Sequence, residues 1–172
     1  MRSVHSEFWS GAKAELPLLV GVMPFGMIFG VLALGAGIPP SATQAMSAVV
    51  FGGSAQFVVA QLFGLGTPTL VIVMTAIVVN LRHALYSASV APYLRSLHPV
   101  WKWLLAYLLT DEAYAVAITH YQQEAEVDST GMRQWYFLGA GLALWSTWQA
   151  STAAGILLGT VIPASWSLNV TL

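Results

Sequence analysis

The sequence predicts an all-α integral membrane protein, a polytopic bundle of about five spans with at least one broken or re-entrant helix. Of its 172 residues, 57% are hydrophobic and only 8% are charged, whereas soluble domains carry about 25% charged residues. The mean hydropathy is +0.71, and the apolar residues gather into runs of the roughly 20 residues that a span requires. So few charges cannot cover a water-facing surface, and a net charge of −1 does not favour nucleic-acid binding.

The first expected span is Leu16–Ala36, and residues 1–15 before it form a polar, amphipathic segment. A signal peptide has a shorter apolar core of 7–15 residues, so we interpret this run as a span that is retained. Arg2 and Lys13 favour the cytoplasmic side for the N-terminal segment under the positive-inside rule. The glycines of "PFGMIFG" are expected to let helices pack closely, as small residues do in membranes.

The second expected span, about Ala42–Phe63, has an unusual middle. It contains "GGSAQF", in which two adjacent glycines precede a serine and Gln56. Such a sequence suggests a weakened or unwound helix, and membranes tolerate irregular backbone only where it lines protein or water. Packing and a functional role are both open for this segment.

The third expected helix runs from Thr67 to Leu94. At 1.5 Å per residue it is about 42 Å long, against about 30 Å for the hydrocarbon core. We therefore expect it to bend or break between Val79 and Ala84. Wound as a helix, its second half carries two polar stripes that a lipid-facing helix could not both accommodate. One stripe is Asn80, His83 and Ser87, and the other is Arg82, Tyr86, Ser89 and Tyr93.

The fourth expected span, Trp101–Tyr121, places Asp111 and Glu112 at its middle. Because Arg82 is permanently cationic, we expect one of these two carboxylates to hold it, and His83 is then the evident partner of the other. A purely structural ion pair needs only one acid. The second acid is either protonated and silent, or part of a polar site at membrane depth that binds a charged substrate or passes protons. We favour the polar site.

The fifth expected span runs from about Trp135 to Ile162. It is again rich in glycine, which is typical of close helix packing. Two indoles and an amide lie inside it, either as packed core or as a wall that contacts substrate: Trp145, Trp148 and Gln149.

The chain contains, in this order, "LPLLVGVMPFGMIFGVLALGAG", "FGGSAQFVVAQL", "NLRHALYSASVAPYL", "LLTDEAYAVA" and "YFLGAGLALWSTWQAST". Together these stretches resemble the AzlC family, the azaleucine-resistance family of branched-chain amino-acid exporters. The resemblance implies a multi-pass protein of the bacterial inner membrane that exports Val, Leu or Ile together with a small AzlD-type membrane subunit. The residues carried over by motif are Gln56, Asn80, Arg82, His83, Tyr86, Asp111 and Glu112.

The resemblance extends from about Phe8 to Pro163, and we take residues 16–163 as the transmembrane bundle. Members of the family usually continue past "GTVIP" with further apolar segments, whereas this sequence ends in "ASWSLNVTL". Residues 164–172 are expected to be a C-terminal tail or the start of a missing further span. We expect a shortened natural chain, a truncated one, or a partner that completes the bundle.

The predicted function is secondary transport, the export of neutral hydrophobic amino acids, with proton coupling through the second acid and His83 as a natural mechanism. A zwitterionic substrate needs a cation for its carboxylate, which Arg82 supplies if it is unpaired. It also needs an acceptor for its ammonium, which Asp111 or Glu112 supplies. The alternative is a non-transporting membrane subunit or assembly factor whose polar residues are structural. The expected partners are the small subunit, the bilayer and, as a further option, a second copy of the chain.

An enzyme is not expected, because no Ser/His/Asp or histidine-cluster spacing stands out in the sequence. The phosphate-binding pattern G-x-x-x-x-G-K-[ST] does not occur either. We expect no cofactor and no metal, and the lack of cysteine excludes disulfides and thiol chemistry.

Overall fold

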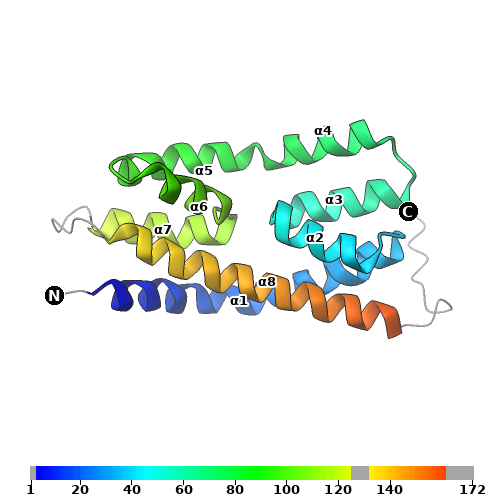
Figure 1. Ribbon diagram of the computed structural model, residues 1–172, viewed down its shortest axis with the longest axis horizontal. Coiled ribbons are helices and arrows are strands. Elements are labelled where there is room, and N and C mark those ends of the chain that lie inside the picture. Colours follow the sequence, from blue (N-terminus) through cyan, green and yellow to red (C-terminus); the bar gives the residue numbers. More distant parts are fainter. Residues whose placement is uncertain (1–2, 125–131, 162–172) are drawn as a thin grey trace. The chain divides into compact units, whose positions relative to one another are not determined.

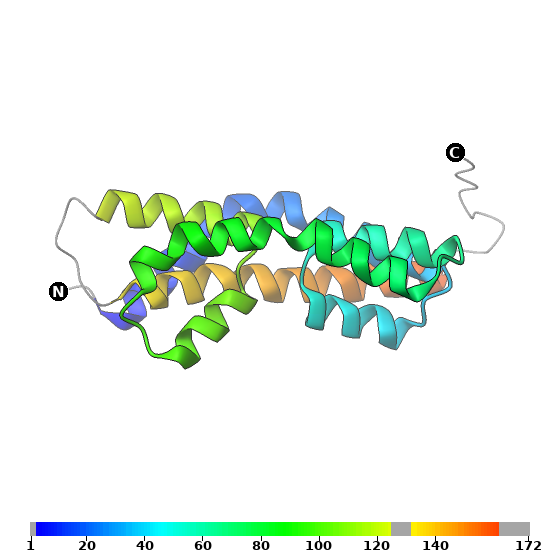
Figure 2. The ribbon, with the colours of Figure 1, turned by 90° about the horizontal axis from the view of Figure 1, so that it is seen from above.

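The computed structural model describes residues 3–124 and 132–161, and it confirms the all-helical class, with no strand among those residues (Figures 1 and 2). The expected tail at residues 164–172 lies outside the described residues. In chain order the elements are α1 (Val4–Gly35), α2 (Pro40–Val50), α3 (Gly53–Gly64), α4 (Thr69–Asn80), α5 (Arg82–Val90), the 3₁₀ helix η1 (Ala91–Leu94), α6 (Pro99–Tyr107), α7 (Asp111–Glu124) and α8 (Arg133–Val161).

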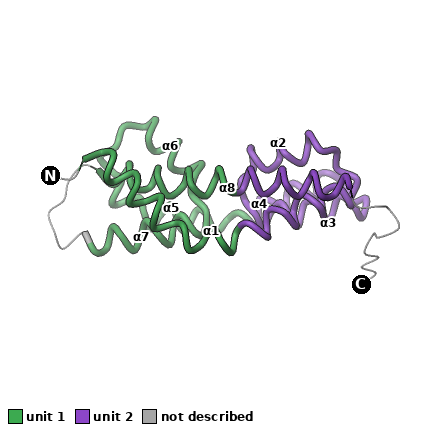
Figure 3. Tube along the Cα trace, turned by 90° about the horizontal axis from the view of Figure 1, so that it is seen from below, with its two compact units in different colours: residues 1–22, 80–147 green, residues 23–79, 148–172 purple. Residues whose placement is uncertain are grey.

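The chain divides into two compact units (Figure 3). Unit 1 consists of Met1–Val22 and Asn80–Thr147, and unit 2 of Met23–Val79 and Trp148–Leu172. Unit 1 therefore contains the first part of α1, all of α5, η1, α6 and α7, and the first part of α8. Unit 2 contains the remaining parts of α1 and α8 with α2, α3 and α4. The sequence did not predict this division of the expected bundle.

Helix α1 starts at Val4 and continues without interruption through the expected boundary between residues 15 and 16. Its start is fixed by a reciprocal cap in which the N–H of Ser6 donates to Ser3 Oγ and the N–H of Ser3 donates to Ser6 Oγ. The predicted span started where the apolar run begins, at Leu16. The residues before it are nevertheless helical and pack within unit 1.

The second expected span, Ala42–Phe63, is two short helices, because α2 ends at Val50 and α3 begins at Gly53. Between them Phe51 adopts left-handed backbone angles (φ 41°, ψ 44°). The chain reverses direction there, and α3 returns opposite to α2 (Figures 1 and 2). The irregular backbone that "GGSAQF" predicted is therefore present, as the turn of a helical hairpin.

The fourth expected span, Trp101–Tyr121, is also broken, which the sequence did not predict. Helix α6 ends at Tyr107 and α7 begins only at Asp111, where the chain again reverses direction (Figure 1). Thr110 explains the break, since its Oγ accepts a hydrogen bond from the N–H of Ala113 and so caps the start of α7. No glycine or proline marks this position in the sequence.

The third expected helix breaks where predicted. Helix α4 ends at Asn80, Leu81 forms a turn, and α5 begins at Arg82. Counted across this interruption, Thr69–Leu94 is one of two helical stretches among the described residues that are long and apolar enough to cross a membrane; the other is Val4–Gly35. The predicted bundle with at least one broken helix thus contains long helices combined with two hairpins of half-length helices.

Glycines bring α1 and α8 into backbone contact within each unit. In unit 1, a Cβ placed on Gly11 would lie 2.0 Å from the carbonyl oxygen of Tyr136, so only glycine fits there. In unit 2, a Cβ on Gly155 would lie 2.1 Å from the carbonyl oxygen of Met27, and one on Gly30 would lie 2.6 Å from that of Thr152. These contacts confirm the packing interpretation of the glycines in the first and fifth expected spans.

We predict that Gly11→Ala lowers the thermal stability of the detergent-solubilised protein, because overpacking a closely packed contact costs about 1–3 kcal/mol. Gly21→Ala is the matched control in the same helix, since nothing lies within 4 Å of a Cβ at that position. Size-exclusion chromatography of samples heated to increasing temperatures would give the melting temperature of each variant. Equal melting temperatures for the two would show that the glycine contact is not required.

Candidate functional site

An ion pair joins the start of α5 to the start of α7 in unit 1. Arg82 Nη1 lies 2.6 Å from Asp111 Oδ2, and the two side chains are 31% and 37% exposed. The predicted pairing of Arg82 with one of the two acids is confirmed, with Asp111 as the partner. Tyr86, one turn further along α5, donates a hydrogen bond to the same carboxylate.

The polar stripe that contains Arg82 faces α7. The ring of Tyr86 stacks on that of Tyr114 with centroids 4.5 Å apart, and the Tyr114 hydroxyl lies 3.0 Å from Ser89 Oγ. Further along, the rings of Tyr93 and Tyr121 lie 5.4 Å apart. This stripe therefore contacts α7, but its residues remain partly exposed.

The second stripe of α5 makes local contacts. His83 Nδ1 donates to the backbone carbonyl of Asn80 at 3.1 Å, and its ring meets Tyr86 edge-on. The side-chain oxygen of Asn80 is buried and has no hydrogen-bond partner among the described residues. These contacts fix the orientation of the His83 ring at the break between α4 and α5.

Asp111 and Glu112 occupy the first turn of α7, and not the middle of a continuous helix as predicted. A helix N-terminus carries a partial positive charge that stabilises carboxylates. The expectation failed because "LLAYLLTDEAYAVA" reads as one apolar run with two acids inside it. Thr110 followed by two acids is the sequence signal of a helix start that could have located the break.

Glu112 interacts electrostatically with Glu15, a residue that the sequence did not single out. Glu15 of α1 lies close enough to Glu112 for the two carboxyl groups to repel each other. Glu15 is fully buried, and neither of its carboxylate oxygens has a hydrogen-bond partner within the part of the chain that the structure describes. A proton on one of the two acids relieves the repulsion, as in other pairs of carboxyl groups that share a site.

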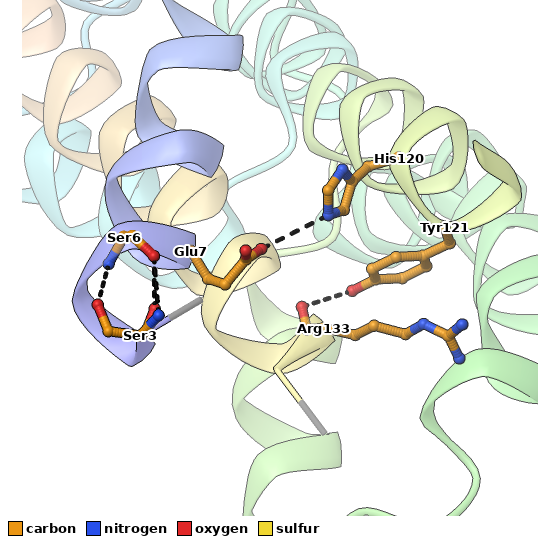
Figure 4. Close-up of polar contacts among 6 residues, drawn as sticks. All are labelled: Ser3, Ser6, Glu7, His120, Tyr121 and Arg133. Carbon is orange, nitrogen blue, oxygen red and sulfur yellow. Dashed lines mark hydrogen bonds and ion pairs between the residues drawn. The ribbon is translucent and has the colours of Figure 1, made fainter. Parts of the chain in front are cut away.

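Glu7 and His120 form a second contact between α1 and α7 that the sequence analysis missed (Figure 4). Glu7 Oε2 lies 3.7 Å from His120 Nε2, and Glu7 is only 5% exposed. The signal was a spacing of four residues between Glu7, Gly11 and Glu15, which places them on one face of a helix. Nearby, the Tyr121 hydroxyl donates to the carbonyl of Arg133 at 2.9 Å (Figure 4).

Unit 2 holds a separate polar network between α2 and α8. Gln44 Nε2 donates to Gln149 Oε1 at 2.7 Å, and Gln149 Nε2 donates to the carbonyl of Ser47 at 3.1 Å. The hydroxyls of Ser47 and Thr152 lie 3.0 Å apart and are buried. Gln149 thus belongs to a neutral network, which the sequence did not predict because Gln44 and Ser47 lie about 100 residues away from α8.

The other predicted residues are distributed over both units. Gln56 is fully buried in unit 2, and neither its amide oxygen nor its amide nitrogen has a hydrogen-bond partner among the described residues. Trp145 lies in unit 1 and donates from Nε1 to the Tyr107 hydroxyl at 2.7 Å. The predicted residues are therefore divided between the units, with Gln56, Trp148 and Gln149 in unit 2 and the others in unit 1.

Unit 1 also contains a cavity of about 330 Å³ between α5, η1, α6 and α8. Its walls are mostly apolar, with two cations that come from the connection before α6 and from α6 itself. The lining residues are Ser87, Val90, Ala91, Leu94, Arg95, Lys102, Leu105, Ala106, Leu109 and Phe137. None of them was among the predicted site residues, and neither ion-pair residue lines the cavity.

Comparison with known proteins places the chain among membrane proteins. The family model described as AzlC protein matches residues 17–162. The chain is 26% identical to the inner membrane protein YgaZ of Escherichia coli, over 89% of this chain and 61% of that protein. It is 25% identical to the branched-chain amino acid transport protein AzlC of Bacillus subtilis, over 92% and 61% of the two chains.

A membrane protein of Archaeoglobus fulgidus is 29% identical over 93% of this chain and 66% of its own length. The chain thus spans about three fifths of the length of the relatives it matches. No solved structure matches the chain significantly.

A double-mutant cycle on Arg82→Gln and Asp111→Asn should show that the two residues are coupled. We expect the loss of stability in the double variant to be smaller than the sum of the losses in the two single variants. The coupling free energy should be about 1–2 kcal/mol, between the values for exposed and buried pairs. Unfolding in mixed micelles with increasing SDS would measure it. A control cycle that combines Arg95→Gln, at an exposed position, with Asp111→Asn should give no coupling. Equal coupling in the two cycles would contradict the assignment of the ion pair.

Proposed function

The chain belongs to the AzlC family, and we propose that it acts as the large subunit of a secondary transporter that exports branched-chain amino acids across the bacterial inner membrane. The proposal takes the substrate class from the name of the Bacillus subtilis relative. Its structural support is the broken backbone of both units, where a half-length helical hairpin turns back at Phe51 in unit 2 and before Asp111 in unit 1.

Broken helices carry this proposal because they are costly in a membrane without a purpose. Backbone groups that leave the helical pattern must be satisfied by protein or by a water-filled cavity. Transporters place substrate and ion sites at such interruptions, where helix ends offer partial charges of both signs. A protein that only anchored a partner would need none of these breaks.

The Arg82–Asp111 pair of unit 1 is not the site that binds the carboxylate of a zwitterionic substrate in this proposal. Arg82 was expected to bind the substrate carboxylate if it were unpaired, but it is engaged with Asp111 in this structure. We therefore assign the pair to holding α5 against α7, and look elsewhere for the carboxylate site. Removing one member of such a pair would leave the other charge without a partner. This explains why both ionisable side chains are present at the breaks.

Proton coupling is assigned to Glu112 with Glu15. Two carboxyl groups that repel each other can exchange one proton without either being locked in an ion pair. Glu15 replaces His83 in this role, because it is buried and lacks hydrogen bonds within the described residues. Asp111, in contrast, is paired with Arg82.

The partnership with a small AzlD-type subunit is also a proposal. Helix α4 presents a broad apolar surface, on which Leu70 is 73% exposed, Val78 is 61% exposed and Ile77 is 52% exposed. In the membrane this surface contacts lipid, the small subunit or a second copy of the chain. Co-purification with the small subunit would support the first partner, and self-association alone would support the last.

Counterflow of labelled leucine in proteoliposomes tests the proposal. The full chain, reconstituted with and without the small subunit, should exchange internal leucine for external label, and excess unlabelled valine or isoleucine should compete. A basic amino acid such as lysine should not compete. Absence of counterflow in both preparations, with correctly folded protein, would favour the alternative of a non-transporting subunit or assembly factor.

We predict that Glu112→Gln and Glu15→Gln leave the folded yield unchanged but abolish leucine export or make its rate independent of pH. Asp111→Asn should instead lower the folded yield, because it strands Arg82. The control is Glu124→Gln, the same substitution at the last residue of α7. Export rates measured from pH 5.5 to 8.5 decide between the outcomes: wild-type rates at every pH in both Glu112→Gln and Glu15→Gln would rule out proton coupling through this pair.

A further inference from the structure

We propose that the turn between α2 and α3 binds the carboxylate of the amino-acid substrate, through the N-terminal N–H groups of α3, the Gln56 amide and the Trp148 indole N–H. The inference rests on the proposed function, because it assigns a carboxylate site within that transporter. All of the groups lie in unit 2. Arg82 was the expected carboxylate ligand, and its pairing with Asp111 leaves this role to another part of the chain.

The turn brings two helix ends of opposite polarity together. Helices α2 and α3 have 11 and 12 residues, which corresponds to about 17 and 18 Å each, or roughly half the hydrocarbon thickness. Only Phe51 and Gly52 separate them. The first N–H groups of α3 and the last C=O groups of α2 lack partners within their own helices. The turn therefore offers donors for a carboxylate beside acceptors for an ammonium group.

The start of α3 carries no acidic side chain, whereas the corresponding start of α7 does. Gly52, at the N-cap of α3, has no side chain with which to cap the helix. Helix α7 is capped by Thr110 and begins with Asp111. Because an uncapped helix N-terminus attracts anions, the two hairpins differ in the one property that a carboxylate site requires.

Gln56 provides the independent observation that points to a ligand. It is fully buried, and both polar atoms of its side chain lack hydrogen-bond partners among the described residues. Helical side chains lean toward the N-terminus of their helix, so the Gln56 amide covers the first turn of α3. A buried amide without partners is destabilising, and a carboxylate beside it would accept a hydrogen bond from its N–H group.

Trp148 supplies another donor on the same face. A Cβ placed on Gly53 would lie 3.2 Å from Cη2 of Trp148, so the indole packs against the start of α3. Gln56 follows Gly53 by three residues and shares its helix face. The indole is 6% exposed, and its Nε1 has no hydrogen-bond partner within the described residues.

The surroundings suit an aliphatic side chain. Phe29 stacks on Trp148 with ring centroids 6.3 Å apart and meets Phe57 at 6.0 Å, and Phe51 is 5% exposed. Donors for one carboxylate that are surrounded by aromatic rings fit a neutral hydrophobic amino acid. A strongly charged substrate would find no partner for its side chain among these residues.

Ligand-induced thermal stabilisation of the purified full chain tests the site independently of transport. Leucine and 4-methylpentanoate both carry the carboxylate, whereas leucinamide carries only the ammonium. We expect leucine and 4-methylpentanoate to stabilise the wild type at millimolar concentration, and leucinamide to be at least tenfold weaker. In Gln56→Glu the apparent Kd for leucine should rise at least tenfold, because the new carboxyl group repels or displaces that of the ligand. Gln61→Glu, the same substitution at an exposed position of α3, should bind leucine like the wild type.

Two further variants keep the test decisive if Gln56→Glu does not fold. Gln56→Leu and Trp148→Phe each remove donors while keeping a side chain of similar size, and each should raise the Kd for leucine several-fold. The proposal is wrong if no carboxylate stabilises the wild type, or if the folded variants bind leucine as the wild type does. It is also wrong if leucinamide binds as well as leucine. Selective carboxylate binding without leucine counterflow would leave the site standing and overturn the proposed function.

Discussion

A polar group inside hydrocarbon has to find its partner within the protein, because lipid offers none. This constraint explains the contacts that polar groups make at the helix breaks. At the start of α7, Thr110 caps the helix and Asp111 sits where the helix dipole favours a negative charge. At the start of α5, Arg82 sits where the same dipole is unfavourable, and its pairing with Asp111 compensates. Two helix starts thus stabilise each other through one ion pair.

The rest of the structure divides into a frame and the elements that it carries. Helices α1 and α8 form the frame, because glycines such as Gly11 and Gly155 bring their backbones into direct contact and leave little room for movement between them. The half-length helices carry the polar groups, including Gln56 and the first turn of α7. Function in this fold is therefore expected where short elements meet a rigid pair of long helices, and not within the long helices alone.

The sequence could predict those features that follow from the length of a helix or from the charges of a few residues. The break near Leu81 followed from length, and the pairing of Arg82 followed from counting charges that a membrane must neutralise. The break before Asp111 was missed, because an apolar run interrupted only by a threonine and two acids fits a span equally well. Glu15 was missed because it precedes the apolar run that begins at Leu16, whereas α1 begins twelve residues earlier than the expected span. The division into two units depends on contacts between distant residues, which no local pattern encodes.

The composition of each unit has a consequence for biosynthesis. Both units draw on α1, which leaves the ribosome first, and on α8, which is made more than a hundred residues later. The backbone contacts of Gly11 and Gly30 wait for that last helix, so neither unit can close while the chain is being inserted. Contacts this distant in sequence form slowly and leave intermediates exposed. Until α8 is made, α1 lacks the backbone contacts that it makes with α8 in the finished protein.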